Sequence, residues 1–199
     1  YPAGGATPSD GVVNLAVGLG KTIVDGGISL SFSPSCPGVL PQFGSVDDMF
    51  HYSQREFYAV AMNQLSSLSF ADEAQYLVKG DMMTAEKDGV LDYIASTWSA
   101  DNEALYEGIN ARGPRIITFA HILKNNVIPL VETIRFIMKL CEDSMGTPVE
   151  IEFAVNMGQG DPVESEMYIL QVRPMVAPVF NPDLVIDENE IGNALCYST

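Results

Sequence analysis

Residues 149–174, VEIEFAVNMGQGDPVESEMYILQVRP, constrain the fold of this chain most, because they contain two alternating patterns joined by a polar loop. Strand side chains point to opposite faces in turn, so such alternation predicts half-buried strands. In the first strand one face carries Val149, Ile151, Phe153, Val155 and Met157, and the other carries Glu150, Glu152, Ala154 and Asn156. In the second strand the same period predicts a common face for Met167, Ile169, Gln171 and Arg173.

The polar loop sets the register that we expect for this hairpin. If residues 158–165 close it with Met157 opposite Glu166, two polar pairs align further along the strands: Glu152 with Gln171, and Glu150 with Arg173. One face then carries a carboxylate, an amide and a guanidinium. Carboxylate and amide oxygens suit Mg²⁺, and a guanidinium forks onto phosphate oxygens. The spacing alone leaves two interpretations open: a nucleotide polyphosphate site, or a plain cross-strand ion pair that needs no ligand.

The acidic composition argues against a nucleic acid or an anionic membrane as the main partner. The formal net charge is −16 over 199 residues, and the hydrophobic fraction of 47% is enough for a substantial core. Residues 142–199 contain eleven acidic residues and a single basic one, Arg173, and this isolation favours a functional role for it. No apolar run approaches the roughly 18 residues of a membrane span, and the N-terminus has no signal pattern.

The cysteines and histidines predict neither a metal site nor a nucleophile. The three cysteines, Cys36, Cys141 and Cys196, are an odd number without metal-type spacing, so we expect a reducing, cytoplasmic compartment. The two histidines, His51 and His121, are far apart in the sequence and flanked by apolar residues, which favours structural roles.

A glycine-rich segment near the N-terminus predicts a strand over 12–17, a turn at the GLG sequence 18–20 and a short helix over 21–24. Two phosphate-loop motifs fail on spacing here. A Walker loop needs a glycine where Leu15 stands, and a dinucleotide fingerprint needs one where Ile23 stands. We therefore favour a plain strand-to-helix turn.

The remaining pattern predicts an α+β protein with a mostly antiparallel or mixed sheet and flanking helices. Further strands are expected at 28–32, 54–62, 75–78, 93–98 and 115–119, with 54–62 buried. Helices are expected from Ser45, around 82–87 and at 129–145. The last is the clearest, because a proline opens it, Gly146 ends it and one face is apolar: Leu130, Ile134, Ile137, Cys141 and Met145.

The hairpin motifs resemble a known family. The sequence EFA at 152–154, followed after a loop by YILQVRP at 168–174, is similar to the closing motif of the ATP-grasp domain in phosphoenolpyruvate synthases and pyruvate phosphate dikinases. The resemblance implies that Glu152 and Gln171 hold Mg²⁺ and that Arg173 contacts the phosphates of ATP.

Other segments extend the resemblance. VVNLAVGLGKTIVDG at 12–26 is similar to the family's strand and Gly-Leu-Gly segment, and the helix ending at Gly146 stands where the family has a helix before this hairpin. Two features depart from the pattern. Lys21 follows Gly-Leu-Gly where the family commonly has an acidic residue, and the loop between the two motif strands is longer than usual.

The resemblance implies a domain organisation and an activity. Residues 1–11 are a loop lead-in, 12–175 the C-terminal portion of a partial ATP-grasp-like domain, and 176–199 an extended tail or linker. The chain begins without a methionine and has no Thr-x-His phosphohistidine motif, so we interpret it as a fragment that lacks the N-terminal half-domain and the phosphohistidine domain of its parent chain. The parent would use ATP to phosphorylate a histidine carrier and then pyruvate, giving phosphoenolpyruvate, while the fragment alone would be inactive.

Two other interpretations stay open. The chain is alternatively a non-catalytic ATP-grasp relic that acts as a binding or regulatory module, which Lys21 and the unfamiliar stretch 33–112 motivate. If the two motif strands do not pair, an unrelated acidic α+β binding protein is favoured instead.

Overall fold

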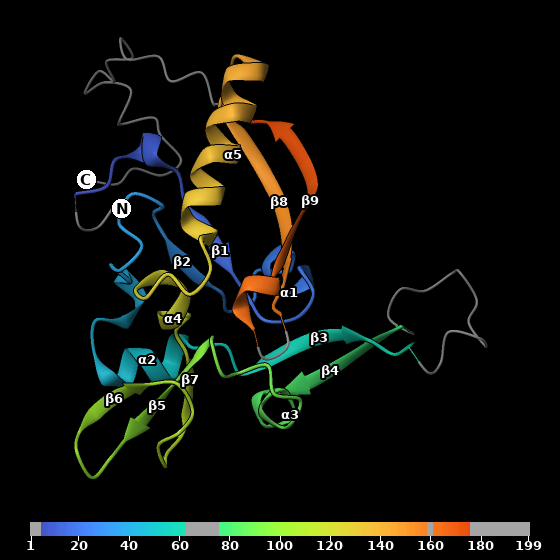
Figure 1. Ribbon diagram of the computed structural model, residues 1–199. Coiled ribbons are helices and arrows are strands. Elements are labelled where there is room, and N and C mark those ends of the chain that lie inside the picture. The colour runs from blue at the N-terminus through green and yellow to red at the C-terminus, as the bar shows by residue number, and fades with distance from the viewer. Residues whose placement is uncertain (1–4, 63–75, 159–160, 176–199) are drawn as a thin grey trace, which may run out of the picture.

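The computed structural model of the chain describes residues 5–62, 76–158 and 161–175. Within these ranges helices alternate with small sheets, and all strand pairings are antiparallel (Figure 1). The predicted α+β class is therefore confirmed. No helix of the described ranges is long and apolar enough to cross a membrane.

The sheets are short and mostly two-stranded. Their strands are β1 (Val13–Leu15) with β2 (Leu30–Phe32), β3 (Glu56–Val60) with β4 (Leu77–Asp81), β5 (Ala95–Ser99) between β6 (Ala104–Glu107) and β7 (Arg115–Ile117), and β8 (Val149–Asn156) with β9 (Glu166–Pro174). The helices are α1 (Lys21–Val24), α2 (Val46–Tyr52), α3 (Met82–Lys87), α4 (Ala120–Leu123) and α5 (Leu130–Met145), with 3₁₀ turns η1 (Pro8–Asp10), η2 (Pro41–Phe43) and η5 (Pro162–Glu164). The sequence pattern predicted neither β6 nor α4.

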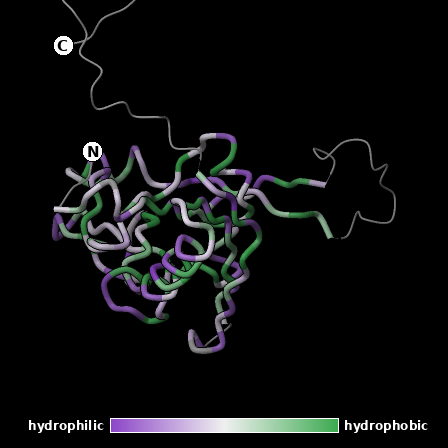
Figure 2. Tube along the Cα trace, turned by 90° about the horizontal axis from the view of Figure 1, so that it is seen from above, coloured by the Kyte–Doolittle hydropathy of each residue, from purple (hydrophilic) through white to green (hydrophobic). Residues whose placement is uncertain are grey.

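The hydrophobic core forms where the β1–β2 and β5–β7 strands meet α4 and the first turns of α5. Its buried side chains include Leu15, Phe32, Ile117, Ile122 and Ile134. Figure 2 shows the main body of the molecule from above, with the β3–β4 hairpin extending from one side of it.

The β3–β4 hairpin corrects one expectation. Residues 54–62 do contain a strand, β3, but its side chains are only partly buried or exposed. The reason is that β3 pairs with β4 alone, and this two-stranded arm projects from the body (Figure 1). Within 54–62 burial is found at the two flanks of β3: Ala61 is 7% exposed, and Gln54 is buried and its side chain bonds both the N–H and the carbonyl of Val17, at 2.8 and 3.0 Å.

A partly buried ion pair joins α3 to β7. Arg115 donates from Nε and Nη2 to the two carboxylate oxygens of Glu86, at 3.1 and 2.7 Å. Its Nη1 donates to Thr97 Oγ1 at 2.7 Å and to the Ala111 carbonyl at 2.8 Å. Hydrogen bonding from Arg115 holds the pKa of Glu86 below its ordinary value.

Helix α5 positions the hairpin. Its N-terminal turns bury Leu130, Val131 and Ile134 in the core, while Met145 at its end is 45% exposed, so the predicted apolar face is buried only over the first part of the helix. Gly146 ends the helix with φ of +68°, a left-handed value that glycine adopts without a Cβ clash. Strand β8 starts three residues later and packs against the same helix.

Candidate functional site

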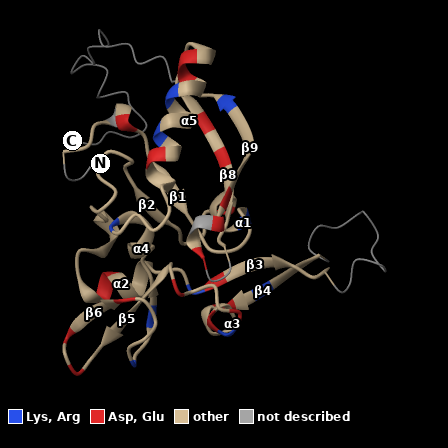
Figure 3. Ribbon diagram, in the orientation of Figure 1, with Lys and Arg blue, Asp and Glu red and all other residues tan. Residues whose placement is uncertain are grey.

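The two faces of the β8–β9 hairpin differ in burial. Phe153, Val155 and Met167 lie on the inner face and pack against the core. On the opposite, outer face, four side chains with polar ends are exposed: Glu150, Glu152, Gln171 and Arg173. Figure 3 shows the acidic residues along β8 beside a basic residue at the end of β9. The outer face is therefore a polar wall on a strand pair that the core holds in place.

Arg173 and Glu150 form a two-point ion pair across the strands, as the expected register requires. Arg173 donates from Nε to Glu150 Oε2 at 3.0 Å and from Nη2 to Oε1 at 2.7 Å. These hydrogen bonds hold the pKa of Glu150 below, and the pKa of Arg173 above, their ordinary values. Both side chains remain about half exposed, at 50% and 52%, so the guanidinium is oriented by its partner and still open to solvent.

Glu152 and Gln171 lie directly opposite each other, one residue pair further along the same face. Both are exposed, and neither side chain forms a hydrogen bond or ion pair with the described residues. Their oxygens can therefore accept a cation without breaking a protein contact. Mg²⁺ binds through one or two carboxylates with water and phosphate oxygens, so this sparse donor pair fits it. No cluster of three or more His, Cys, Asp or Glu with metal-site geometry occurs in the described part of the chain.

A β-bulge changes the register towards the loop. Asn156, not Met157, pairs with Glu166, and the pairing shifts by one residue between Glu152 and Phe153. The expected register was wrong at this end, because Leu170 is an extra residue with no counterpart on β8.

The bulge also reverses which β9 side chains face outward. Met167 and Ile169 pair with inner-face residues of β8, so the expected common face of these two with Gln171 and Arg173 is wrong. Tyr168 instead pairs with Ala154 and lies on the outer face. Regular alternation does not predict this position for Tyr168. The only signal in the sequence is the adjacent apolar pair at 169–170, which interrupts the period of two.

The Gly-Leu-Gly segment forms the predicted strand-to-helix turn. Gly18 has φ of +85°, and Leu19 donates its backbone N–H to the Tyr58 carbonyl at 2.9 Å, so the turn packs on β3. Lys21 pairs with Asp25 at 2.8 Å, and its ammonium lies 5.8 Å from the centre of the Tyr58 ring. In this structure the segment therefore connects β1 to α1 and packs against β3.

The histidines and cysteines lie on other elements. His51 packs edge-on against Tyr52 in α2, and His121 in α4 packs edge-on against Tyr93. Neither Cys36 nor Cys141 forms a disulfide within the described residues, and Cys196 lies outside them.

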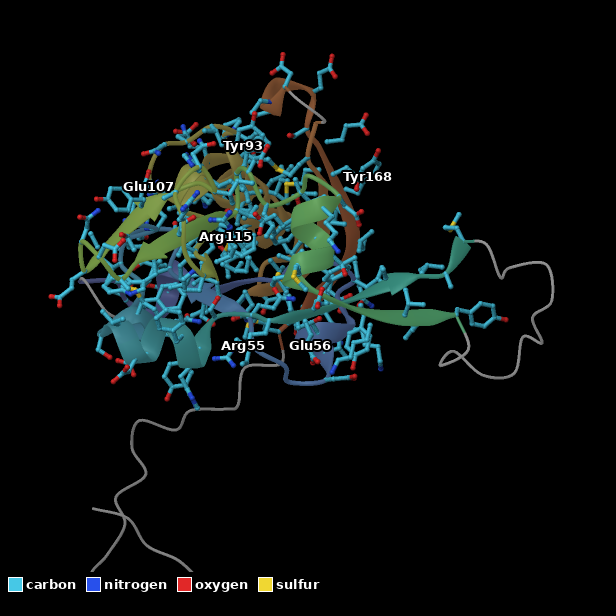
Figure 4. The ribbon with its side chains drawn as sticks, turned by 90° about the horizontal axis from the view of Figure 1, so that it is seen from below. Arg55, Glu56, Tyr93, Glu107, Arg115 and Tyr168 are labelled. Carbon is cyan, nitrogen blue, oxygen red and sulfur yellow. The ribbon has the colours of Figure 1, made fainter. Side chains whose placement is uncertain are left out.

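Two surface depressions do not involve the hairpin. One, of about 360 Å³, is lined by Lys21, Val24, Asp25, Tyr76 and Leu77. The other, of about 230 Å³, is lined by residues of three segments: Phe50, Ser53, Gln54, Arg55, Met82, Pro114, Arg115 and Ile116. Figure 4 shows Arg55 and Arg115 well separated from Tyr168 on the hairpin. We place the candidate site on the hairpin because the side chains of its outer face have the chemistry of a metal and phosphate site. This face is an open surface and does not line either depression.

Comparison with known proteins agrees with the resemblance drawn from the hairpin motifs. No curated protein and no solved structure matches this chain. The sequence model described as "Pyruvate phosphate dikinase, AMP/ATP-binding domain" matches residues 3–178. This match covers most of the chain and includes both the Gly-Leu-Gly segment and the hairpin. The chain therefore belongs to the family of pyruvate phosphate dikinase AMP/ATP-binding domains.

Proposed function

We propose that the outer face of the β8–β9 hairpin is one wall of a Mg²⁺ and ATP site in a phosphotransferase of the phosphoenolpyruvate synthase or pyruvate phosphate dikinase type. Family membership supports ATP as the ligand. The observation that carries the assignment is the alignment of Glu152 with Gln171 and of Glu150 with Arg173 on one exposed face.

In this proposal the hairpin acts by positioning and by neutralising charge. Glu152 and Gln171 hold Mg²⁺, which when bound offsets the charge of the phosphates. Arg173 has five N–H donors, of which two bind Glu150, so three remain for phosphate oxygens. Because β8 is fixed by α5 and the core, these groups keep their geometry without reorganising as charge develops.

The proposal extends to the parent protein. Residues 12–175 form the C-terminal portion of the nucleotide-binding domain, and an N-terminal half-domain supplies the opposite wall. A phosphohistidine domain accepts the phosphoryl group and passes it to pyruvate. Residues 12–175 then have no activity alone, because the hairpin contributes only one side of the site.

Substitution of Arg173 in the intact parent protein tests the assignment. Arg173→Ala should lower ATP-dependent phosphoryl transfer roughly a hundredfold to a thousandfold, the usual effect of losing one contact to developing charge. The rate of Arg173→Lys should lie between those of the wild type and Arg173→Ala, because lysine keeps the positive charge and loses the two-point hydrogen bonding of the guanidinium. Arg112→Ala, at an exposed arginine outside the hairpin, is the control. Turnover near that of the wild type in Arg173→Ala would contradict the proposal.

A second candidate is a non-catalytic relic that serves as a binding or regulatory module. Two features favour it: Arg173 is already paired with Glu150 without a ligand, and Lys21 stands in place of an acidic residue. Titration calorimetry of the intact protein with ATP, with and without Mg²⁺, separates the two. Nucleotide binding that depends on the metal supports the enzyme, and its absence supports the relic.

A further inference from the structure

Tyr168 lies on the same outer face as the candidate metal and phosphate residues. It pairs with Ala154, whose methyl group leaves the ring uncovered, and Tyr168 is 45% exposed. Its hydroxyl donates to Glu166 Oε2 at 2.5 Å, which restricts the position of the ring. A large aromatic ring that is held in place and exposed is suited to stacking on a planar ligand.

The outer face has a fixed order of chemical groups along the strands. The Arg173–Glu150 pair comes first, the Glu152–Gln171 pair is next, and the Tyr168–Ala154 pair follows beyond the bulge. With a rise of about 3.3 Å per residue, the four steps from Glu150 to Ala154 span about 13 Å. A cation, a metal-binding pair and an aromatic ring are thus ordered like the phosphates, the metal and the base of an extended nucleotide.

We infer that the nucleotide lies along the hairpin, with its phosphates at the Arg173 end and its nucleoside against the ring of Tyr168. This inference rests on the proposed function and adds the direction of the ligand and the residue that distinguishes a nucleotide from a bare polyphosphate. Glu166, held beside the ring by the Tyr168 hydroxyl, has a carboxylate oxygen left to accept hydrogen bonds from ribose hydroxyls.

Protonation agrees with this role. Hydrogen bonding to Glu166 raises the pKa of Tyr168 above its ordinary value of 10.0, so the phenol stays neutral at physiological pH. A phenolate in this position would repel the nucleotide, whereas the neutral ring stacks on it and keeps Glu166 in place.

Binding of ATP and of inorganic tripolyphosphate, each with Mg²⁺, to the intact protein tests the inference. Tyr168→Ala should weaken ATP binding roughly 5-fold to 150-fold, the range for loss of one stacked base, and leave tripolyphosphate binding unchanged. Tyr168→Phe should keep most of the ATP affinity, because it keeps the ring. Arg173→Ala should weaken the binding of both ligands.

A control and a second variant make the outcome decisive. Tyr106→Ala removes a tyrosine of similar exposure, 43%, on β6, and should bind both ligands as the wild type does. Tyr168→Leu fills more of the position than alanine and should show the same selective loss, which excludes misfolding of the alanine variant as the cause. ATP affinity unchanged in both variants, or equal loss of ATP and tripolyphosphate, would overturn the inference and leave the proposed function standing. A wild-type protein that binds neither ligand would overturn both.

Discussion

Substitution of Gly18, the first glycine of the Gly-Leu-Gly segment, by alanine should destabilise the fold, because of its surroundings as well as its backbone conformation. With φ of +85°, it lies in the left-handed region that L-residues disfavour. A Cβ added there would also lie 2.6 Å from the Tyr58 carbonyl oxygen and 2.9 Å from Phe57 Cβ. Neither of these atoms is the free end of a flexible side chain, so the clash can be relieved only by separating the backbone of the turn from that of β3.

The costs of the left-handed conformation and of the clash can be estimated separately. The left-handed conformation costs an alanine about 1–2 kcal/mol, and overpacking against a fixed neighbour adds about 1–3 kcal/mol. Gly18→Ala should therefore lower the free energy of unfolding by about 2–5 kcal/mol. Gly26, with φ of +71° and no heavy atom within 4 Å of its added Cβ, isolates the conformational effect. Gly26→Ala should cost only about 1–2 kcal/mol.

Urea unfolding followed by circular dichroism measures both variants against the wild type. Amide hydrogen exchange adds a local test, because the displaced Tyr58 carbonyl is the acceptor of the Leu19 N–H. Exchange at Leu19 should accelerate in Gly18→Ala and not in Gly26→Ala. Equal stability of the two variants would refute the reasoning, since it would mean that crowding of the added Cβ against Tyr58 and Phe57 costs nothing.

Two further predictions concern the ion pair of α3 and the start of α2. Because the pKa of Glu86 is lowered in the folded state, the stability from its pair with Arg115 is present above the unfolded pKa, near 4.5, and is lost as the pH falls through the lower folded value. Glu86→Gln should therefore flatten the decline in stability below pH 4.5, measured by urea unfolding across pH, and an unchanged acid profile would contradict this. Ser45 caps α2 by accepting the N–H of Asp48 at 3.1 Å, so Ser45→Ala should cost about 1 kcal/mol and Ser45→Asn much less. Thermal unfolding of both variants checks this, and equal losses would exclude a capping effect.

The elements that could be predicted from sequence are those whose signal is local. Helix α5 has a periodic apolar face, and Gly146 marks its end, so its bounds follow from residues within the helix. Helix α3 likewise matches the expected range, because Asp81 caps it at its start. The burial of β3 does not follow from its own residues, because it depends on whether another layer covers the strand. Strand β6 and helix α4 are short, four residues each, and have no distinct period.

In the β8–β9 hairpin, a bulge makes the register of strand pairing near the loop differ from the register at the far end. The inner-face residues of β9 are Met167, Ile169 and Val172, and the step of three between the last two indicates an extra residue. The loop register expected from the sequence was off by one residue, and the bulge at Leu170 adds one, so the two differences cancel beyond it. The proposed metal and phosphate residues lie beyond the bulge, where the expected and observed registers agree. Their alignment could therefore be predicted from the sequence. Tyr168 lies before the bulge, where a shift of one residue reverses the face, so its place beside them depends on the three-dimensional structure.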